Sequence, residues 1–136
     1  MSNLEQTLSI IKPDAVERNL TENIKSIFVK NNLKIKEDKK LQITKEEAAE
    51  FYKVHQSKPF YDDLCSYLSS GPIVVMILEG FNAVSLNREL MGATDPKLAS
   101  ENTIRKLYGL SIDKNSVHGS DSIENAKKEI NFFFKS

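Results

Sequence analysis

Ile73-Val74-Val75-Met76-Ile77-Leu78 is the longest apolar run in the chain, and Gly71-Pro72 and Glu79-Gly80 bound it. An unbroken apolar run of this kind is typical of a strand that is buried on both faces. The run is much shorter than the roughly 20 residues that a helix needs to cross a bilayer. It therefore predicts a buried strand, and it indicates no membrane role.

Further strands are predicted on either side of this one. The β-branched run Thr7-Leu8-Ser9-Ile10-Ile11 ends at Lys12-Pro13, because proline cannot donate a hydrogen bond to a central ladder. Between residues 33 and 43 apolar residues alternate with lysines, which is typical of a strand with one face in water. A short final strand is expected just before His118.

Helices are predicted between the strands from capping boxes and from apolar residues at helical spacing. The boxes are Asn19 with Glu22, Thr44 with Glu47, and Asp121 with Glu124. The predicted helices run from about 20 to 31, from Thr44 onward, from just after Pro59, from Asn82 to Met91 and from Ser122 to about Phe134, with a further turn over Thr103–Tyr108. The last helix should bury Ile123, Ala126, Ile130 and Phe133.

This order of elements is the βαββαβ plan of ferredoxin-like folds with extra helices, an α+β class with a four-stranded antiparallel sheet. No linker, repeat or low-complexity stretch divides the chain, so residues 1–136 are expected to form a single domain. The 40% hydrophobic and 28% charged residues are typical of a globular protein.

Charge and cysteine content narrow the classes of partner and compartment. Nineteen basic and nineteen acidic residues leave a formal net charge of +0, so no overall field attracts nucleic acid or a membrane. We expect a small ligand instead. The single cysteine, Cys65, cannot form an internal disulfide, and the first residues lack a secretory signal pattern, which predicts a cytoplasmic protein.

The octet Asn115-Ser116-Val117-His118-Gly119-Ser120-Asp121-Ser122 is the stretch most indicative of chemistry. Free histidine has a pKa of about 6.5, so its imidazole is largely unprotonated near neutral pH and can attack phosphorus directly. Gly119 allows backbone to approach a ligand closely, and a helix start nearby offers free N–H groups to a phosphate. The alternative is a histidine that only makes a hydrogen bond in a loop.

Basic residues elsewhere supply the charge that a phosphate site needs. Lys12 stands at a predicted strand end, Arg88 on a predicted helix and Arg105 in a long irregular stretch. An arginine offers a fork of donors that matches phosphate oxygens in pairs. The sequence alone does not bring these cations together, and three unrelated surface cations are the alternative.

The octet closely resembles the active-site signature of the nucleoside diphosphate kinases, in which the phosphate-carrying histidine stands in an Asn-x-x-His-Gly-Ser-Asp context. The resemblance runs along essentially the whole chain, from Lys12-Pro13-Asp14 to Glu129-Ile130, and it is to the short bacterial form. It implies a sheet order of 2-3-1-4. It also implies reversible ping-pong transfer of the terminal phosphate from a nucleoside triphosphate, usually ATP, to a nucleoside diphosphate, with broad base and sugar tolerance.

The resemblance implies a role for each matching residue. In catalysis, His118 carries the phosphate on Nδ1 (the pros nitrogen), Glu129 orients its ring, Ser120 bonds Glu129, Tyr52 makes a hydrogen bond near His118, and Lys12 contacts sugar hydroxyls and phosphate. In nucleotide binding, Arg88, Thr94 and Arg105 hold the phosphates, Asn115 reaches the ribose, Phe60 stacks on the base, and Leu64 and Ile112 complete the base slot.

The resemblance further implies partners and a cofactor. Mg²⁺ is expected to be carried by the nucleotide phosphates, and no protein side chain is expected to bind it. The partners are nucleoside triphosphates and diphosphates, with no nucleic acid or membrane required. A homo-oligomer is expected, a hexamer or tetramer built from dimers that form through a sheet edge and the first predicted helix.

Other functions are less consistent with the sequence. An RNA-binding module of the same fold would carry an aromatic Gly-Phe-x-Phe-type strand, which is absent, and an inactive scaffold would be expected to lose the histidine or a phosphate cation. A histidine relay between proteins is the nearest competitor. The chain also departs from the family pattern: Asn19 and Glu22 replace glycines, Glu101-Asn102 replaces Pro-Gly, and Lys106 replaces a small residue.

Overall fold

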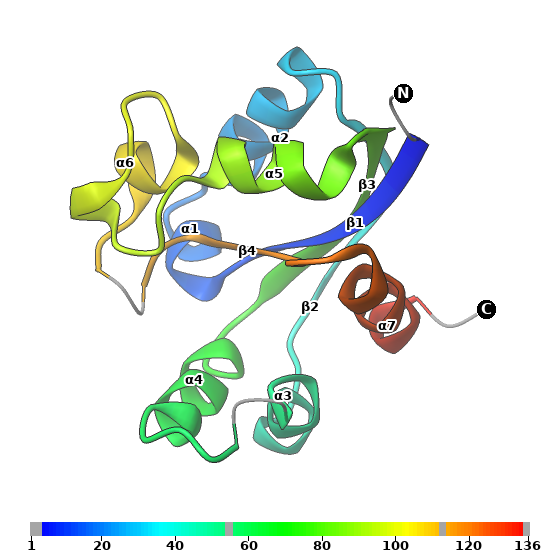
Figure 1. Cartoon of the computed structure of the whole chain (residues 1–136). Coiled ribbons are helices and arrows are strands. Elements are labelled where there is room, and N and C mark those ends of the chain that lie inside the picture. The colour runs from blue at the N-terminus through cyan, green and yellow to red at the C-terminus, as the bar shows by residue number, and fades with distance from the viewer. Residues whose placement is uncertain (1–3, 54–55, 112–113, 135–136) are drawn as a thin grey trace.

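The computed structural model describes residues 4–53, 56–111 and 114–134. Its strands form one four-stranded sheet in the order β2-β3-β1-β4, with every neighbouring pair antiparallel (Figure 1). The strands are β1 (Leu4–Ile11), β2 (Lys34–Leu41), β3 (Ile73–Phe81) and β4 (Val117–Gly119). The predicted order 2-3-1-4 and the ferredoxin-like α+β class are therefore confirmed.

Strand β3 is central, and it is buried on both faces as its apolar run predicts. Val74, Met76 and Leu78 belong to one hydrophobic core, whereas Ile73 and Val75 belong to a second core on the opposite face. The alternation follows from the period of two along a strand. β3 is three residues longer than the apolar run, since the ladder with β1 continues to the Leu4–Phe81 pair.

Helices cover both faces of the sheet (Figure 1). Helices α1, α2, α5 and α6 contribute to the first core, and α3, α4 and α7 contribute to the second. Their bounds are α1 Pro13–Glu17, α2 Thr21–Lys30, α3 Lys45–Phe51, α4 Tyr61–Leu68, α5 Ala83–Met91, α6 Ile104–Tyr108 and α7 Ile123–Phe133, and a short 3₁₀ helix, η2, spans Pro96–Leu98. Within the described ranges, no helix is long and apolar enough to cross a membrane.

Only one of the predicted capping boxes forms. Thr44 Oγ1 accepts from the Glu47 N–H at 3.0 Å and Glu47 Oε1 accepts from the Thr44 N–H at 2.9 Å, so this prediction is confirmed. The box at Asn19 is wrong, because Asn19 is in the left-handed region with a φ of 60° and α2 begins only at Thr21. The preceding helix α1 was not predicted, since its five residues are too few to show a periodic pattern.

The start of the last helix also differs from the prediction. Ser122, rather than Asp121, caps α7, and its Oγ accepts from the Asn125 N–H at 3.1 Å. Asp121 instead accepts from the Asn125 side chain at 2.6 Å. Ala126 and Phe133 are buried as predicted, but Ile123 is 47% exposed because it lies in the first turn, beyond the core.

Two further details correct the predictions. His118 lies inside β4, opposite Ile10 of β1, and not after the strand. Asn82 does precede α5, but it has a φ of 54° and its side chain makes no capping hydrogen bond. Gly92 ends that helix as predicted, with a φ of 86° that favours glycine.

Candidate active site

A cavity of about 740 Å³, here called the histidine cavity, gathers most of the predicted site residues. Those that line it are Lys12, Tyr52, Phe60, Leu64, Arg88, Thr94, Arg105, Asn115, His118 and Glu129. Ser120 is fully buried and reaches the cavity through Glu129. Ile112 lies outside the described residues. The fold thus brings together cations that the sequence left apart.

His118 is held in a defined orientation by Glu129. Nε2 of His118 is 3.0 Å from Oε1 of Glu129, and the Ser120 hydroxyl donates to the same oxygen at 2.9 Å. Because an ionised carboxylate can only accept, this geometry places the ring proton on Nε2 and leaves the lone pair on Nδ1. Both side chains are about one-fifth exposed, at 22% and 20%, so a ligand can reach the ring.

Secondary structure explains how these groups meet. The antiparallel pairing of β4 with β1 fixes the backbone of His118, and the Ser120 N–H extends the contact by donating to the Leu8 carbonyl at 3.2 Å. Helix α7 starts at its Ser122 cap, which places Glu129 two turns along it. The buried Ala126 and Phe133 orient α7 against the second core, and Glu129 faces the strand.

Two aromatic rings lie beside His118, and one of them, Phe51, was missed by sequence reasoning. The ring of Phe51 lies edge-on to the imidazole, with 5.3 Å between centroids and an interplanar angle of 74°. The Tyr52 ring centroid lies 6.5 Å away at 86°. Burial raises the pKa of Tyr52, so its phenol stays protonated and can donate a hydrogen bond. The only signal for Phe51 was its aromatic character at the end of a helix, which usually indicates core.

Arg105 is held by backbone carbonyls. Its Nη1 donates to the Gly92 carbonyl at 3.0 Å and its Nη2 to the Val117 carbonyl at 2.9 Å. Burial, with a smaller contribution from the nearby Arg88, lowers the pKa of Arg105 to about 10. Its Nε is buried and has no hydrogen-bond partner within the described part of the chain. Arg105 is therefore a charged group at neutral pH whose burial an anion would compensate.

Lys12 and Asn115 form a second polar edge of the cavity. Nζ of Lys12 donates to Oδ1 of Asn115 at 3.0 Å, and Nδ2 of Asn115 donates to the Thr94 carbonyl at 3.0 Å. Lys12 is 6% exposed and Asn115 is 2% exposed. This chain of contacts ties the end of β1 to the loop before η2, so the predicted phosphate and ribose contacts share one rigid frame.

Gly119 is required for a close approach, but that approach is to α5. A Cβ on Gly119 would lie 2.3 Å from Nδ2 of Asn87 and 2.8 Å from Cε of Met91. The sequence predicts instead that this glycine admits a ligand. Asn87 and Arg88 are neighbours on α5. Because Gly119 has no side chain, α5 can pack closely against β4, and this sets how near Arg88 lies to His118.

The predicted base slot lies at the mouth of the cavity. Phe60 immediately precedes α4 and is 43% exposed, and Leu64 follows one turn later. The Nζ of Lys58 is 5.6 Å from the Phe60 ring centroid, a cation–π distance. An exposed aromatic ring forms a surface on which a flat base can stack.

Other lining residues were not predicted from the sequence. Asp121, Asn125 and Lys128 join Glu129 around the cavity. The hydrogen bond from Asn125 is the main factor that lowers the pKa of Asp121, with smaller contributions from Arg88 and His118. Their spacing of three and four residues along the start of α7 was the available signal. Across the described ranges, no group of three or more His, Cys, Asp or Glu side chains is placed to hold a metal ion.

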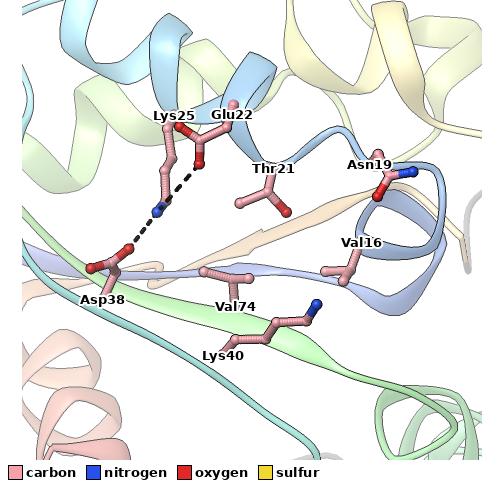
Figure 2. Close-up of a pocket in the computed structure, with 8 residues that line it drawn as sticks. All are labelled: Val16, Asn19, Thr21, Glu22, Lys25, Asp38, Lys40 and Val74. Carbon is pink, nitrogen blue, oxygen red and sulfur yellow. Dashed lines mark hydrogen bonds and ion pairs between the residues drawn. The ribbon is translucent and has the colours of Figure 1, made fainter.

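A separate hollow of about 390 Å³ lies between α2 and β2 (Figure 2). None of the predicted site residues lines it. Lys25 points into it between Asp38 and Glu22 and forms ion pairs with both. These ion pairs neutralise the charge of Lys25 locally.

Comparison with known proteins identifies the family. A family model described as nucleoside diphosphate kinase matches residues 5–136. The chain belongs to the nucleoside diphosphate kinase family. A curated nucleoside diphosphate kinase from a Nitratiruptor species is 59% identical over 131 residues, with 96% of each chain covered. One from Gluconobacter oxydans is 56% identical, and the match covers 96% of this chain and 94% of that one.

Solved structures of the family have the same fold. The nucleoside diphosphate kinase of Aquifex aeolicus superposes with a TM-score of 0.97 at 41% identity, covering 98% of this chain and 97% of that chain. The enzyme of Encephalitozoon cuniculi superposes with a TM-score of 0.94 at 38% identity, covering 97% and 90%. Membership of the nucleoside diphosphate kinase family makes the chain a phosphotransferase that acts on nucleotides, as the sequence predicts.

Proposed function

We propose that the nucleoside diphosphate kinase reaction of this chain passes through a phosphohistidine on Nδ1 of His118. The observation that carries the proposal is the contact between His118 Nε2 and Glu129 Oε1 at 3.0 Å, which leaves Nδ1 as the nucleophile. Attack by Nδ1 on the γ-phosphorus of a nucleoside triphosphate forms an N–P bond and breaks the bond to the bridging oxygen, which leaves with the nucleoside diphosphate. A second nucleoside diphosphate then takes the phosphoryl group by the reverse step.

Glu129 stabilises the positive charge that the imidazole gains during attack. Ser120 holds the carboxylate through its hydroxyl, and the aromatic edge of Phe51 limits rotation of the ring. These contacts leave the ring little freedom, and holding the nucleophile in this orientation lowers the activation barrier for its attack.

The phosphates are proposed to bind Arg88, Arg105, Thr94 and Lys12, which line the cavity around His118. Phosphoryl transfer requires mainly positive charge and position, because the negative charge is spread over the phosphate oxygens. Mg²⁺ is the proposed cofactor, bound by the phosphates of the nucleotide. Glu50, Asp121 and Glu129 are the carboxylates that line the cavity, and none of them is part of a ligand cluster in the described ranges.

The base is proposed to stack on Phe60 with Leu64 beside it, while Asn115 and Lys12 contact the sugar. Stacking is possible for any base because each has a π face, so we expect broad base tolerance. The proposed slot of Phe60, Leu64 and Ile112 offers no polar side chain to a base edge, which also limits how strongly one base can be preferred.

Assembly into a homo-oligomer, a hexamer or tetramer built from dimers, is the proposed quaternary structure. Strand β2 is at the edge of the sheet and mostly exposed, and α2 lies beside it across the hollow of Figure 2. In the loop region, Leu98, Leu107 and Leu110 are 77%, 52% and 60% exposed. Exposed apolar groups and an open edge strand are features that contacts between subunits would cover.

Residues 1–136 are proposed to form one nucleoside diphosphate kinase domain that acts in the cytoplasm. Cys65 is a buried free thiol, which is consistent with a reducing compartment.

The proposal is tested by labelling with γ-³²P ATP and magnesium, followed by removal of the nucleotide. The wild type should retain label that survives alkali and is lost in acid, and His118→Ala should retain none. His55→Ala is the matched control, since it removes the only other histidine and should label normally. Label that persists in His118→Ala would exclude this intermediate.

A further inference from the structure

Asp14 is a buried carboxylate that is surrounded by donors. It is the second residue of α1 and 6% exposed. Oδ2 accepts from the Ser116 hydroxyl at 2.9 Å and from Nη2 of Arg18 at 3.1 Å, and Oδ1 accepts from the Tyr67 hydroxyl. The Asp14 N–H in turn donates to the Tyr67 oxygen at 2.9 Å. Asp14 itself does not line the histidine cavity.

The partners of Asp14 do not line that cavity, but each lies close in the chain or by hydrogen bond to a residue that does. Tyr67 is on α4, one turn after Leu64 of the base slot. Ser116 lies two residues before His118. Nη2 of Arg18 also donates to the carbonyl of Tyr108 at 2.6 Å, and Tyr108 ends α6, which carries Arg105. One carboxylate therefore connects the base slot, the histidine strand and, through Arg18, the phosphate cations.

The link to Ser116 acts on a strained backbone. Ser116 has a φ of 74° and is fully buried, and a residue with a Cβ occupies this left-handed region at a cost of roughly 1 kcal/mol or more. Its hydroxyl is held by Asp14, and its carbonyl accepts from the Lys12 N–H at 2.8 Å. These bonds fix the turn from which β4 emerges, and so fix the position of His118.

We propose that Asp14 is a positioning residue for the kinase reaction, which holds His118 in register with the base slot through its bonds to Ser116 and Tyr67. This inference rests on the proposed roles of His118 and the base slot. The bond to Ser116 sets where the nucleophile stands, and the bond to Tyr67 sets where α4 presents the nucleotide. Burial and the bond to Asp14 raise the pKa of Tyr67, so the phenol remains a donor at neutral pH.

Two substitutions, each of which removes one hydroxyl, separate these links. Tyr67→Phe removes the hydroxyl that contacts Asp14 and leaves the bond to Ser116 in place. Ser116→Gly removes the hydroxyl on the other side, and glycine adopts the positive φ without strain. Asp14→Asn weakens both links while keeping the size of the side chain. Glu17→Gln on the exposed side of α1 is the matched control.

The readout is the rate at which His118 becomes phosphorylated by two donors. Phosphoramidate has no base and reports only on the histidine, whereas ATP also reports on the base slot. Ser116→Gly should slow labelling by both donors about tenfold, with the KM for ATP within about twofold of the wild type. Tyr67→Phe should raise the KM for ATP about tenfold and leave labelling by phosphoramidate unchanged. Asp14→Asn should show both effects and Glu17→Gln neither.

The outcomes distinguish this inference from a purely structural role and from the proposed function. If the variants melt at lower temperature but label at wild-type rates with both donors, Asp14 serves stability alone and the inference is wrong. If Asp14→Asn does not fold, the test rests on Tyr67→Phe, which should affect ATP alone, and on Ser116→Gly, which should affect both donors. The inference is wrong if both variants slow labelling by ATP and by phosphoramidate equally. If the wild type carries no label on His118, the proposed function fails first and this inference fails with it.

Discussion

Replacing Glu129 by glutamine removes the charge beside His118 and leaves the geometry intact. Oε1 of Glu129 accepts from both His118 Nε2 and the Ser120 hydroxyl, and the carbonyl oxygen of a glutamine can accept the same two bonds. The substitution therefore changes only the electrostatic interaction between residue 129 and the imidazole of His118. It acts when the imidazole becomes positively charged, which is during attack on phosphorus.

The size of the effect follows from the distance and the exposure. Unit charges separated by the observed 3.0 Å would interact by about 5 kcal/mol at an effective dielectric constant of about 20. Both side chains are about one-fifth exposed, at 22% and 20%, so water screens part of this interaction. A hydrogen bond to a charged group contributes roughly 1.5–3 kcal/mol, and we take about 2–3 kcal/mol as the loss. This corresponds to a decrease of about 30- to 150-fold in the phosphorylation rate.

The assay is rapid-quench measurement of the first turnover with ATP, which isolates phosphorylation of His118 from product release. Glu129→Gln should lower the rate constant by the amount above and leave the nucleotide dissociation constant within about twofold, because Glu129 acts on the ring and not on the nucleotide. Glu124→Gln, on the exposed first turn of the same helix, is the matched control. A Glu129→Gln rate within about threefold of the wild type would refute this role for the carboxylate.

Three further substitutions test other parts of the cavity. Phe51→Leu should lower kcat about 2- to 10-fold with KM unchanged, since an aromatic pair contributes roughly 0.5–1.5 kcal/mol to ring orientation, and an unchanged kcat would contradict this. Arg105 has a pKa of about 10 and is proposed to bind phosphate in its charged form, so ADP affinity should fall as the pH rises through about 10. Arg105→Ala should lose that component, measured by calorimetric titration, and an identical pH profile would exclude it. Gly119→Ala should destabilise the fold by about 1–3 kcal/mol, because its Cβ would lie 2.3 Å from Asn87 Nδ2, and unchanged urea unfolding would show that α5 can shift freely.

The fold was predictable where the apolar pattern is long. The central run Ile73–Leu78 fixes β3 because a strand of uninterrupted apolar residues must be covered on both faces. The short α1 has no comparable pattern. It begins at Pro13, which was interpreted from the sequence only as the end of a strand. Capping was ambiguous for another reason. Asp121 and Ser122 are adjacent and both are favoured caps, so the choice between them depends on backbone geometry that only the fold supplies.

The nucleophile of the site could be predicted from the sequence, but the way in which the other residues come together around it could not. His118 stands in a distinctive octet, whereas Arg88 and Arg105 can be recognised as site residues only when α5 and α6 bring them to one cavity. Resemblance to a family supplied that convergence before the structure did. Neither the sequence pattern nor the resemblance identified Phe51, because an aromatic residue on a helix is most simply interpreted as part of the core. Here Phe51 packs against the second core and also contacts the ring of His118.

Two of the departures from the family pattern lie in the left-handed backbone region. Asn19 and Asn102 stand where the resemblance implies glycine, and they have φ values of 60° and 69°. Asparagine is among the few residues with a Cβ that enter the left-handed region at modest cost, because its short amide can bond locally. Glycine is therefore replaced by the side chain best able to keep the turn. The unfolded state also loses the extra freedom that a glycine would give it, and this offsets part of the cost of the positive φ.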